Sequence, residues 1–388
     1  MTQVGGTVEP GFEGVKGAFE RNFAEHGEVG AAFALHVDGK KVVDLYGGIA
    51  DADTGRAYDE DTLQLVFSTT KGATAMCANL LAERGQLDVD APVAQYWPEF
   101  AQNGKENIPV RMLLNHQAGL YTVDTAPAYA DTLRWDPIIE KLAEQKPLWE
   151  PGTAHGYHAV TYGWLVGEVV RRITGRSIGQ FFQDELAEPL GIEFWIGLPK
   201  EQHNRVAPLV QAEAPTDPAA RAMAEQFMGP DTVMGKALGC SGALTSPDGD
   251  NSFNRPDMWS AEIPAANGIT NARSLSRLYA SLIGDGVDGI RTLNDDTIAK
   301  ATVVSDTYAD SVLMGMGTRF GLGFMLASDF AAFGGPKGFG HPGAGGSVGF
   351  ADPEKGVAFG YVMNKMQQNL AGDPRTLTLI EASYAAIG

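Results

Sequence analysis

Segments with β-strand character lie near both ends of this 388-residue chain, and the stretch between them has mostly helical patterns. Residues 31–37 and 41–46 are two β-prone runs, and Asp38-Gly39 between them is a strong hairpin signal. Residues 64–67 form a third, shorter run. Strands at both ends with helices between them indicate one mixed domain that the chain leaves and later rejoins.

The C-terminal part holds three more β-like runs, at residues 320–327, 345–351 and 357–364. The fold class that follows is α/β (α+β), with a mostly antiparallel sheet flanked by helices and an inserted helical domain.

This pattern also predicts the domain boundaries. Residues 1–85 and 201–388 are expected to form one discontinuous α/β domain, and residues 86–200 the helical domain. An active site would then lie in the cleft between them, where pockets commonly occur.

Apolar residues three and four positions apart predict helices at several points along the chain. The predicted helices cover residues 12–27, 71–85, 110–114, 162–173 and 377–387, with a further one that begins after Asn271. Gly85 and Gly175 mark two of the C-terminal ends. Residues 199–265 show no strong periodicity and are expected to form a long covering loop or lid.

Ser68 and Lys71 are three residues apart just before the helical pattern that runs to Gly85. Side chains at this spacing share one face of a helix, so the amine can reach the hydroxyl. A serine hydroxyl needs an adjacent base, and a lysine becomes that base when burial lowers its pKa. An isolated Ser-x-x-Lys is more often an ordinary helix cap with a solvated lysine, so the rest of the sequence must decide between the two readings.

Composition excludes several classes of function. The formal charge is 29 minus 48, or −19, which opposes binding to nucleic acid and to anionic membrane surfaces. Two cysteines, Cys77 and Cys240, give no disulfide framework. His155 and His158 have no nearby cysteine or acidic third ligand, so no metal site is expected.

Residues 1–10 are polar and contain neither a basic nor an apolar signal region. No run approaches the ~20 apolar residues of a membrane-spanning helix. We therefore expect a cytoplasmic protein without a membrane anchor.

Residues 345–349 match Gly-x-Ser-x-Gly, the nucleophile elbow of α/β-hydrolases. The triad of that fold needs a histidine after the serine, whereas the last histidine here, His341, precedes Ser347. The glycines are better explained by a strand that closely approaches Ser68 and its substrate.

Three motifs follow one another along the chain: Ser68-Thr69-Thr70-Lys71, Tyr157-His158-Ala159 and His341-Pro342-Gly343. Together they resemble the penicillin-recognising serine hydrolase superfamily, whose members carry Ser-x-x-Lys, Tyr-x-Asn and Lys-Thr-Gly or a variant of it. The resemblance extends to residues 85–88 and 113–120. The variant motifs look most like the family VIII carboxylesterases, which are built on a class C β-lactamase scaffold.

The resemblance implies a role for each matching residue. Ser68 would attack an ester carbonyl, and Lys71 and Tyr157 would share the proton transfers, with the identity of the first base left open. Tyr157 would then protonate the leaving alcohol and help to activate water for deacylation. Backbone N–H groups of Ser68 and Ala344 would form the oxyanion hole.

Three further residues are expected to bind substrate, namely Tyr121, His341 and Gly343. Tyr121 directly follows a predicted helix end and is expected to face the cavity, while the other two belong to the third motif.

Two departures from the superfamily pattern bear on the substrate. Ala159 replaces the asparagine that would hold an acylamino side chain, and His341 replaces the lysine that would pair with a carboxylate. Both changes favour a serine carboxylesterase for small to medium acyl esters, with a small-molecule substrate and no cofactor. The alternatives are a β-lactamase, D-peptidase, amidase or transesterase of the same scaffold, or a non-catalytic binding protein, and the oligomeric state stays open.

Overall fold

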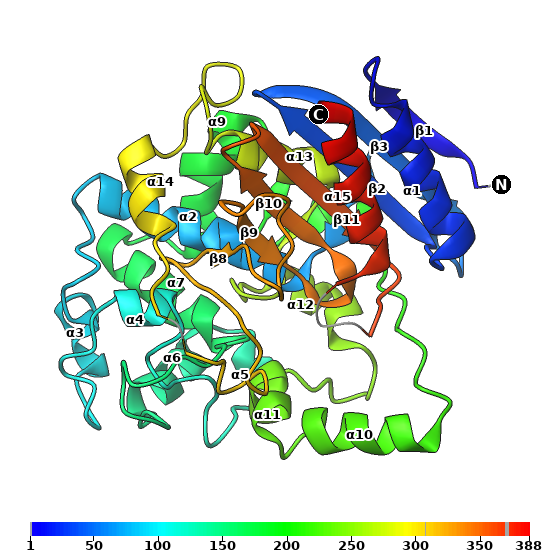
Figure 1. Ribbon diagram of the computed structural model, residues 1–388. Coiled ribbons are helices and arrows are strands. Elements are labelled where there is room, and N and C mark those ends of the chain that lie inside the picture. The colour runs from blue at the N-terminus through cyan, green and yellow to red at the C-terminus, as the bar shows by residue number, and fades with distance from the viewer. Residues whose placement is uncertain (1, 307, 369–371) are drawn as a thin grey trace.

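The computed structural model describes residues 2–306, 308–368 and 372–388, and an antiparallel sheet forms its centre (Figure 1). The strands are β1 (Val4–Val8), β2 (Gly30–Val37), β3 (Lys40–Asp51), β4 (Arg56–Ala57), β8 (Met325–Leu326), β9 (Phe339–Pro342), β10 (Val348–Asp352) and β11 (Val357–Met363). Their order is β1-β3-β2-β11-β10-β9-β8, with β4 paired to β3, and each of these pairs is antiparallel. N-terminal and C-terminal strands therefore meet at the β2–β11 pair, and the predicted fold class is confirmed.

A second, small sheet has the order β5-β7-β6, with β5 (Gln64–Leu65), β7 (Ile269–Thr270) and β6 (Phe194–Trp195). This sheet brings together three distant parts of the chain, and its strand β5 lies shortly before Ser68 in the sequence.

Helices flank the main sheet on both faces. The helices of the described residues are α1 (Glu13–Glu25), α2 (Thr70–Glu83), α3 (Val93–Tyr96), α4 (Arg111–Leu114), α5 (Tyr129–Thr132), α6 (Asp136–Glu144), α7 (Thr161–Thr174), α8 (Ile178–Phe182), α9 (Glu188–Leu190), α10 (Pro218–Met228), α11 (Val233–Gly239), α12 (Pro256–Ser260), α13 (Ala272–Ala280), α14 (Asp295–Ala301) and α15 (Pro374–Ile387). Figure 1 shows α1 and α15 together in front of the sheet and α13 behind it.

Two glycines allow α13 to lie close to the sheet. Gly349 of β10 pairs with Gly360 of β11. A Cβ at Gly349 would lie 2.6 Å from the Tyr279 ring, and one at Gly360 would lie 2.4 Å from the Ala272 carbonyl oxygen. Any larger side chain at either position would push α13 away, because these distances are below van der Waals contact.

Strong local signals in the sequence correspond to observed elements. Asp38 and Gly39 both have positive φ, at 47° and 75°, as a tight hairpin turn requires. Asn271 caps α13, since its side-chain oxygen accepts a hydrogen bond from the Ser274 N–H at 2.9 Å. Gly175 ends α7 in the left-handed conformation with φ 71°.

The prediction of a strand over residues 320–327 is wrong for most of its length. Only Met325–Leu326 forms a strand, because the chain turns at Gly323, whose φ of 88° suits glycine, and folds Phe320 back onto Met325. Strand β1 was not predicted, since its glycines hide any alternation.

The prediction of a loop over residues 199–265 is also wrong in part. This segment contains helices α10, α11 and α12, the first two of which lie along the lower edge in Figure 1. Their start signals are present in the sequence: the Asp217 side chain accepts from the Ala219 N–H, and the Thr232 hydroxyl accepts from the Gly235 N–H.

The predicted division into residues 1–85 with 201–388 and residues 86–200 stays a prediction. Strand β6 lies inside the second segment but pairs with β7 of the first. In the described ranges, no helix combines the length and apolar character needed to cross a membrane.

Candidate active site

Ser68 lies at a tight junction between β5 and α2. A 3-10 turn, η1 (Phe67–Thr69), leads into the helix, and Phe67 has φ 44°, a conformation that bulky residues rarely adopt. The Thr70 hydroxyl donates to the Phe67 carbonyl at 2.5 Å and accepts from the Gly268 N–H at 2.8 Å. These bonds hold the turn that presents the Ser68 hydroxyl at the start of α2.

Lys71 is fully buried one turn further along α2, and its Nζ lies 3.0 Å from Ser68 Oγ. Nζ also donates to the carbonyl oxygens of Ala159 at 2.6 Å and Ala265 at 3.0 Å. Burial lowers the pKa of Lys71 well below its usual range, which favours the neutral amine. Two carbonyls then accept its two hydrogens, and its lone pair is left for the Ser68 hydroxyl.

The Tyr157 ring lies beside the same amine, with its centroid 4.8 Å from Lys71 Nζ. Burial raises the pKa of the Tyr157 phenol, and a hydrogen bond with the Ser68 hydroxyl opposes this with a smaller effect. The phenol therefore stays protonated, so that a neutral amine and a protonated phenol both face Ser68.

His341 also lies beside the Tyr157 phenol, with Nε2 at 3.5 Å from the Tyr157 hydroxyl. Burial, with a smaller contribution from Lys71, lowers the pKa of His341 to about 3. The neutral ring donates from Nδ1 to the Pro342 carbonyl at 2.7 Å, which leaves the Nε2 lone pair directed at Tyr157.

The two backbone amides expected to form the oxyanion hole belong to Ser68 and Ala344. Neither N–H donates to an acceptor within residues 2–306, 308–368 and 372–388. Both residues line the same cavity, so both amides are available to an oxygen that binds there.

Gly343 and Ser347 connect the third motif to the turn that carries Ser68. A Cβ at Gly343 would lie 2.2 Å from the Val66 carbonyl oxygen, so only glycine fits. Ser347 Oγ donates to the same carbonyl at 2.9 Å and lies 3.1 Å from Thr69 Oγ1. The serine of the Gly-x-Ser-x-Gly sequence therefore joins two segments of the backbone. The glycines of that sequence face other parts of the protein, since a Cβ at Gly345 would lie 2.9 Å from Met366 and one at Gly349 would lie 2.6 Å from the Tyr279 ring, so the prediction that they let the strand approach Ser68 is wrong.

The cavity next to Ser68 is mostly apolar. Its walls are Ser68, Tyr157, Leu238, Leu313, Met325, Phe330, His341, Pro342, Gly343 and Ala344. Tyr121 is not among them, and its ring stacks on Trp149 with centroids 5.8 Å apart. Of the residues expected to bind substrate, the structure brings His341 and Gly343 to Ser68 and leaves Tyr121 outside this cavity.

The two histidines at metal-like spacing each have protein partners. His158 donates from Nδ1 to the Gly156 carbonyl at 2.7 Å and accepts at Nε2 from the Leu120 N–H at 2.9 Å. His155 lies against Asp306 at 2.6 Å instead. The two rings therefore do not converge on one point.

Asp310 is a residue that sequence reasoning missed. It is buried, and its Oδ1 accepts hydrogen bonds from the N–H groups of Tyr157, Val312 and Leu313 at 3.1, 2.9 and 2.9 Å. It thereby fixes the backbone from which the Tyr157 ring extends. Its position far from any motif gave no signal in the sequence.

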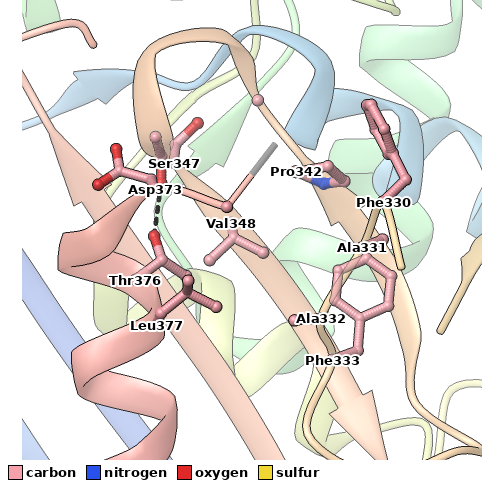
Figure 2. A pocket seen from close by; sticks show the side chains of 13 residues that line it. Phe330, Ala331, Ala332, Phe333, Pro342, Ser347, Val348, Asp373, Thr376 and Leu377 are labelled. Atoms are coloured by element: carbon pink, nitrogen blue, oxygen red, sulfur yellow. Dashed lines mark hydrogen bonds between the residues drawn. The ribbon is translucent and has the colours of Figure 1, made fainter. Parts of the chain in front are cut away.

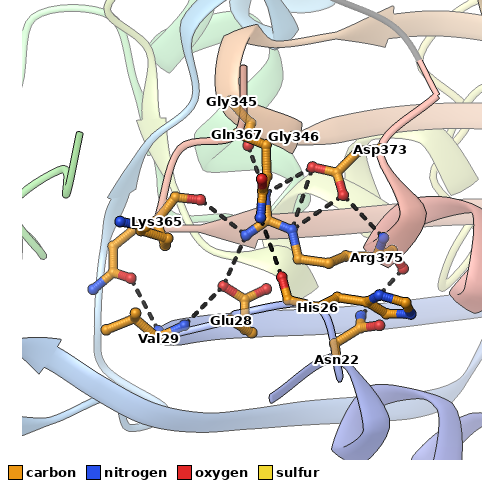
Figure 3. Close-up of polar contacts among 12 residues, drawn as sticks. Asn22, His26, Glu28, Val29, Gly345, Gly346, Lys365, Gln367, Asp373 and Arg375 are labelled. Carbon is orange, nitrogen blue, oxygen red and sulfur yellow. Dashed lines mark hydrogen bonds and ion pairs between the residues drawn. The ribbon is translucent and has the colours of Figure 1, made fainter. Parts of the chain in front are cut away.

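Arg375 of α15 supports the loop that follows Ala344 (Figure 3). It is fully buried and donates to the Gly345 carbonyl at 2.7 Å, while its guanidinium pairs with Asp373 at 2.7 Å and Glu28 at 3.1 Å. Burial raises the pKa of Glu28 to about 7, and the attraction of Arg375 opposes this rise. The ion cluster joins both ends of the chain directly behind the predicted oxyanion hole.

Comparison with known proteins agrees with this geometry. A sequence model of the family described as Beta-lactamase matches residues 15–382, so the chain belongs to the beta-lactamase family and is a serine hydrolase. It is 36% identical over 373 residues to the esterase/beta-lactamase LipL of Mycobacterium tuberculosis, which covers 94% of this chain and 83% of that protein.

Two solved structures superpose on almost the whole chain. A family VIII carboxylesterase has a TM-score of 0.88 at 39% identity and covers 99% of this chain and 100% of its own. A penicillin-binding protein homolog from Caulobacter crescentus has a TM-score of 0.87 at 39% identity, with the same coverage. The predicted resemblance is confirmed.

Proposed function

We propose that this protein is a serine carboxylesterase that hydrolyses small to medium acyl esters through an acyl-enzyme on Ser68. The observation that carries the proposal is the 3.0 Å contact between Ser68 Oγ and the buried Lys71 amine, at the edge of a cavity with apolar walls. The names of LipL and of the carboxylesterase neighbour support the same reaction class.

The protonation states of Lys71 and Tyr157 support one order of proton transfers. Lys71 takes the Ser68 proton as the hydroxyl oxygen attacks the ester carbonyl, because its amine is the group left neutral by burial. The Ser68 and Ala344 amides stabilise the resulting oxyanion. Tyr157, which keeps its proton, donates it to the leaving alcohol and recovers one from Lys71. Water then cleaves the acyl-enzyme by the reverse sequence of proton transfers.

The cavity favours uncharged substrates. Among the residues that line it, no lysine, arginine, aspartate or glutamate appears, and His341 is neutral because its pKa lies at about 3. A carboxylate on a β-lactam or a peptide would lose its hydration there without gaining an ionic partner, which is costly. The apolar side chains of Leu238, Leu313 and Met325 suit an acyl chain instead.

A second candidate is β-lactam or amide hydrolysis by the same residues, including transfer of the acyl group to another alcohol. The names of LipL and of the penicillin-binding protein homolog favour its inclusion.

The two candidates separate in a comparison of kcat/KM for an uncharged ester, the matching amide and a cephalosporin. We expect kcat/KM for the ester to exceed each of the other two values by at least about 10²-fold. Burying a polar or charged group without a partner costs more than about 1 kcal/mol, and an amide also has a poorer leaving group than an ester. The matched control is the methyl ester of the cephalosporin carboxylate, which should react faster than the free acid. Amide or cephalosporin turnover equal to that of the ester would displace the esterase assignment.

We also propose that the reaction takes place in the cytoplasm on a free small molecule. The net charge of −19 supports the free small molecule as substrate, since it disfavours a nucleic-acid partner or an anionic membrane surface.

A further inference from the structure

A second cavity lies beside the one that contains Ser68 (Figure 2). The residues that line both cavities are Phe330, Pro342 and Gly343. The two spaces are therefore neighbours that share one wall, and the second of them has no role in the chemistry described above.

Only one residue of the shared wall has a side chain that can be removed without altering the strand. Pro342 ends β9 and accepts the hydrogen bond of His341, and Gly343 has no side chain. Phe330 is half-buried and lies in the segment between β8 and β9. Phe330 contributes to both linings, so it lies where the two cavities meet.

The second cavity suits hydrocarbon. Phe333, Val348 and Leu377 form much of its lining, and Figure 2 shows these side chains around it. Its polar side chains already have partners within the protein: the Thr376 hydroxyl donates to the Gly346 carbonyl at 3.1 Å, and Asp373 pairs with Arg375. An alkyl chain would enter at no cost in broken hydrogen bonds.

We propose that Phe330 determines the length of ester chain that the enzyme accepts, by closing the active-site cavity against this second one. The inference rests on the proposed ester hydrolysis. The ligand is an uncharged alkyl chain, which can belong to either the acyl or the alcohol part of the ester, and two substrate series distinguish these sources.

The experiment measures kcat/KM for wild type and Phe330→Ala with p-nitrophenyl esters from acetate to laurate, and with acetates of alcohols from ethanol to dodecanol. Phe330→Ala should raise the ratio of long-chain to acetate turnover by about fourfold for each methylene that enters the second cavity. Phe330→Leu is a milder change that is less disruptive to folding, and it should raise the same ratio by an intermediate amount. Leu238→Ala enlarges the first cavity without opening the second, so its ratio should rise less.

A double variant that fills the second cavity again gives the decisive test. Leu377 is half-buried on α15, and the double variant Phe330→Ala/Leu377→Trp should return the long-chain ratio toward the wild-type value while acetate turnover persists. An unchanged ratio for Phe330→Ala in both series, or a raised ratio that Leu377→Trp leaves in place, would overturn the inference alone. Absence of ester turnover in the wild type, acetate included, would overturn the proposed function instead.

Discussion

Replacing Lys71 with methionine is expected to lower kcat/KM for an activated ester by about 10²- to 10⁴-fold, the contribution of a positioned general base. Methionine has a similar length and suits a fully buried position, so the change removes the lone pair at 3.0 Å from Ser68 Oγ with little loss of packing. Initial rates with p-nitrophenyl acetate measure the effect.

The pH dependence of kcat/KM in the wild type also tests whether Lys71 is the general base. Lys71 acts as a base only when it is unprotonated, so kcat/KM should fall as the pH decreases through its lowered pKa. His341 should add no inflection near neutral pH, because burial holds its pKa at about 3.

Lys105 provides the matched control. It is also fully buried, and its Nζ donates to the carbonyls of Ala143 at 2.8 Å and Gln145 at 2.6 Å, but it does not line the cavity. Lys105→Met should lower the melting temperature and leave kcat/KM close to that of the wild type. Equal losses of activity in the two variants would mean that the effect of Lys71 is structural.

Replacing Arg375 with methionine is expected to lower the free energy of unfolding by about 3–5 kcal/mol, the usual cost of removing one partner of a buried ion pair. The change leaves the buried carboxylates of Glu28 and Asp373 without their cation and the Gly345 carbonyl without its donor. Urea denaturation of the purified variant measures the loss.

An exposed arginine serves as the comparison for Arg375. Arg134 pairs with Asp131 at 3.6 Å with its side chain 70% exposed, and Arg134→Met should change the free energy of unfolding by less than about 1 kcal/mol. A similarly small effect for Arg375→Met would show that the ion cluster behind the oxyanion loop does not stabilise the fold.

Elements of the fold with short-range signals could be predicted from the sequence. The Asp38-Gly39 hairpin and the Asn271 helix cap depend on neighbouring residues, so they follow from local rules. Strand β1 depends on a partner elsewhere in the chain, because it pairs with β3. The run at residues 320–327 is broken by a local turn at Gly323 that folds Phe320 back onto Met325, and the β-prone composition of the run hid this turn.

In the active site, too, local contacts could be predicted from the sequence and long-range contacts could not. The i, i+3 spacing predicted that Lys71 reaches Ser68, and the distance of 3.0 Å agrees. The proximity of Tyr157 followed only from the family resemblance, because it lies 86 positions after Lys71 in the sequence. Asp310 and Phe330 had no signal, since a buried carboxylate that accepts backbone hydrogen bonds and a wall between two cavities exist only in the folded protein.

The most direct measurement is the mass of the protein after rapid mixing with p-nitrophenyl acetate and acid quenching, followed by peptide mapping. The account predicts one acetyl group on Ser68 in the wild type and in Ser347→Ala, and none in Ser68→Ala. An acetyl group on Ser347, or ester turnover by Ser68→Ala at the wild-type rate, would contradict it.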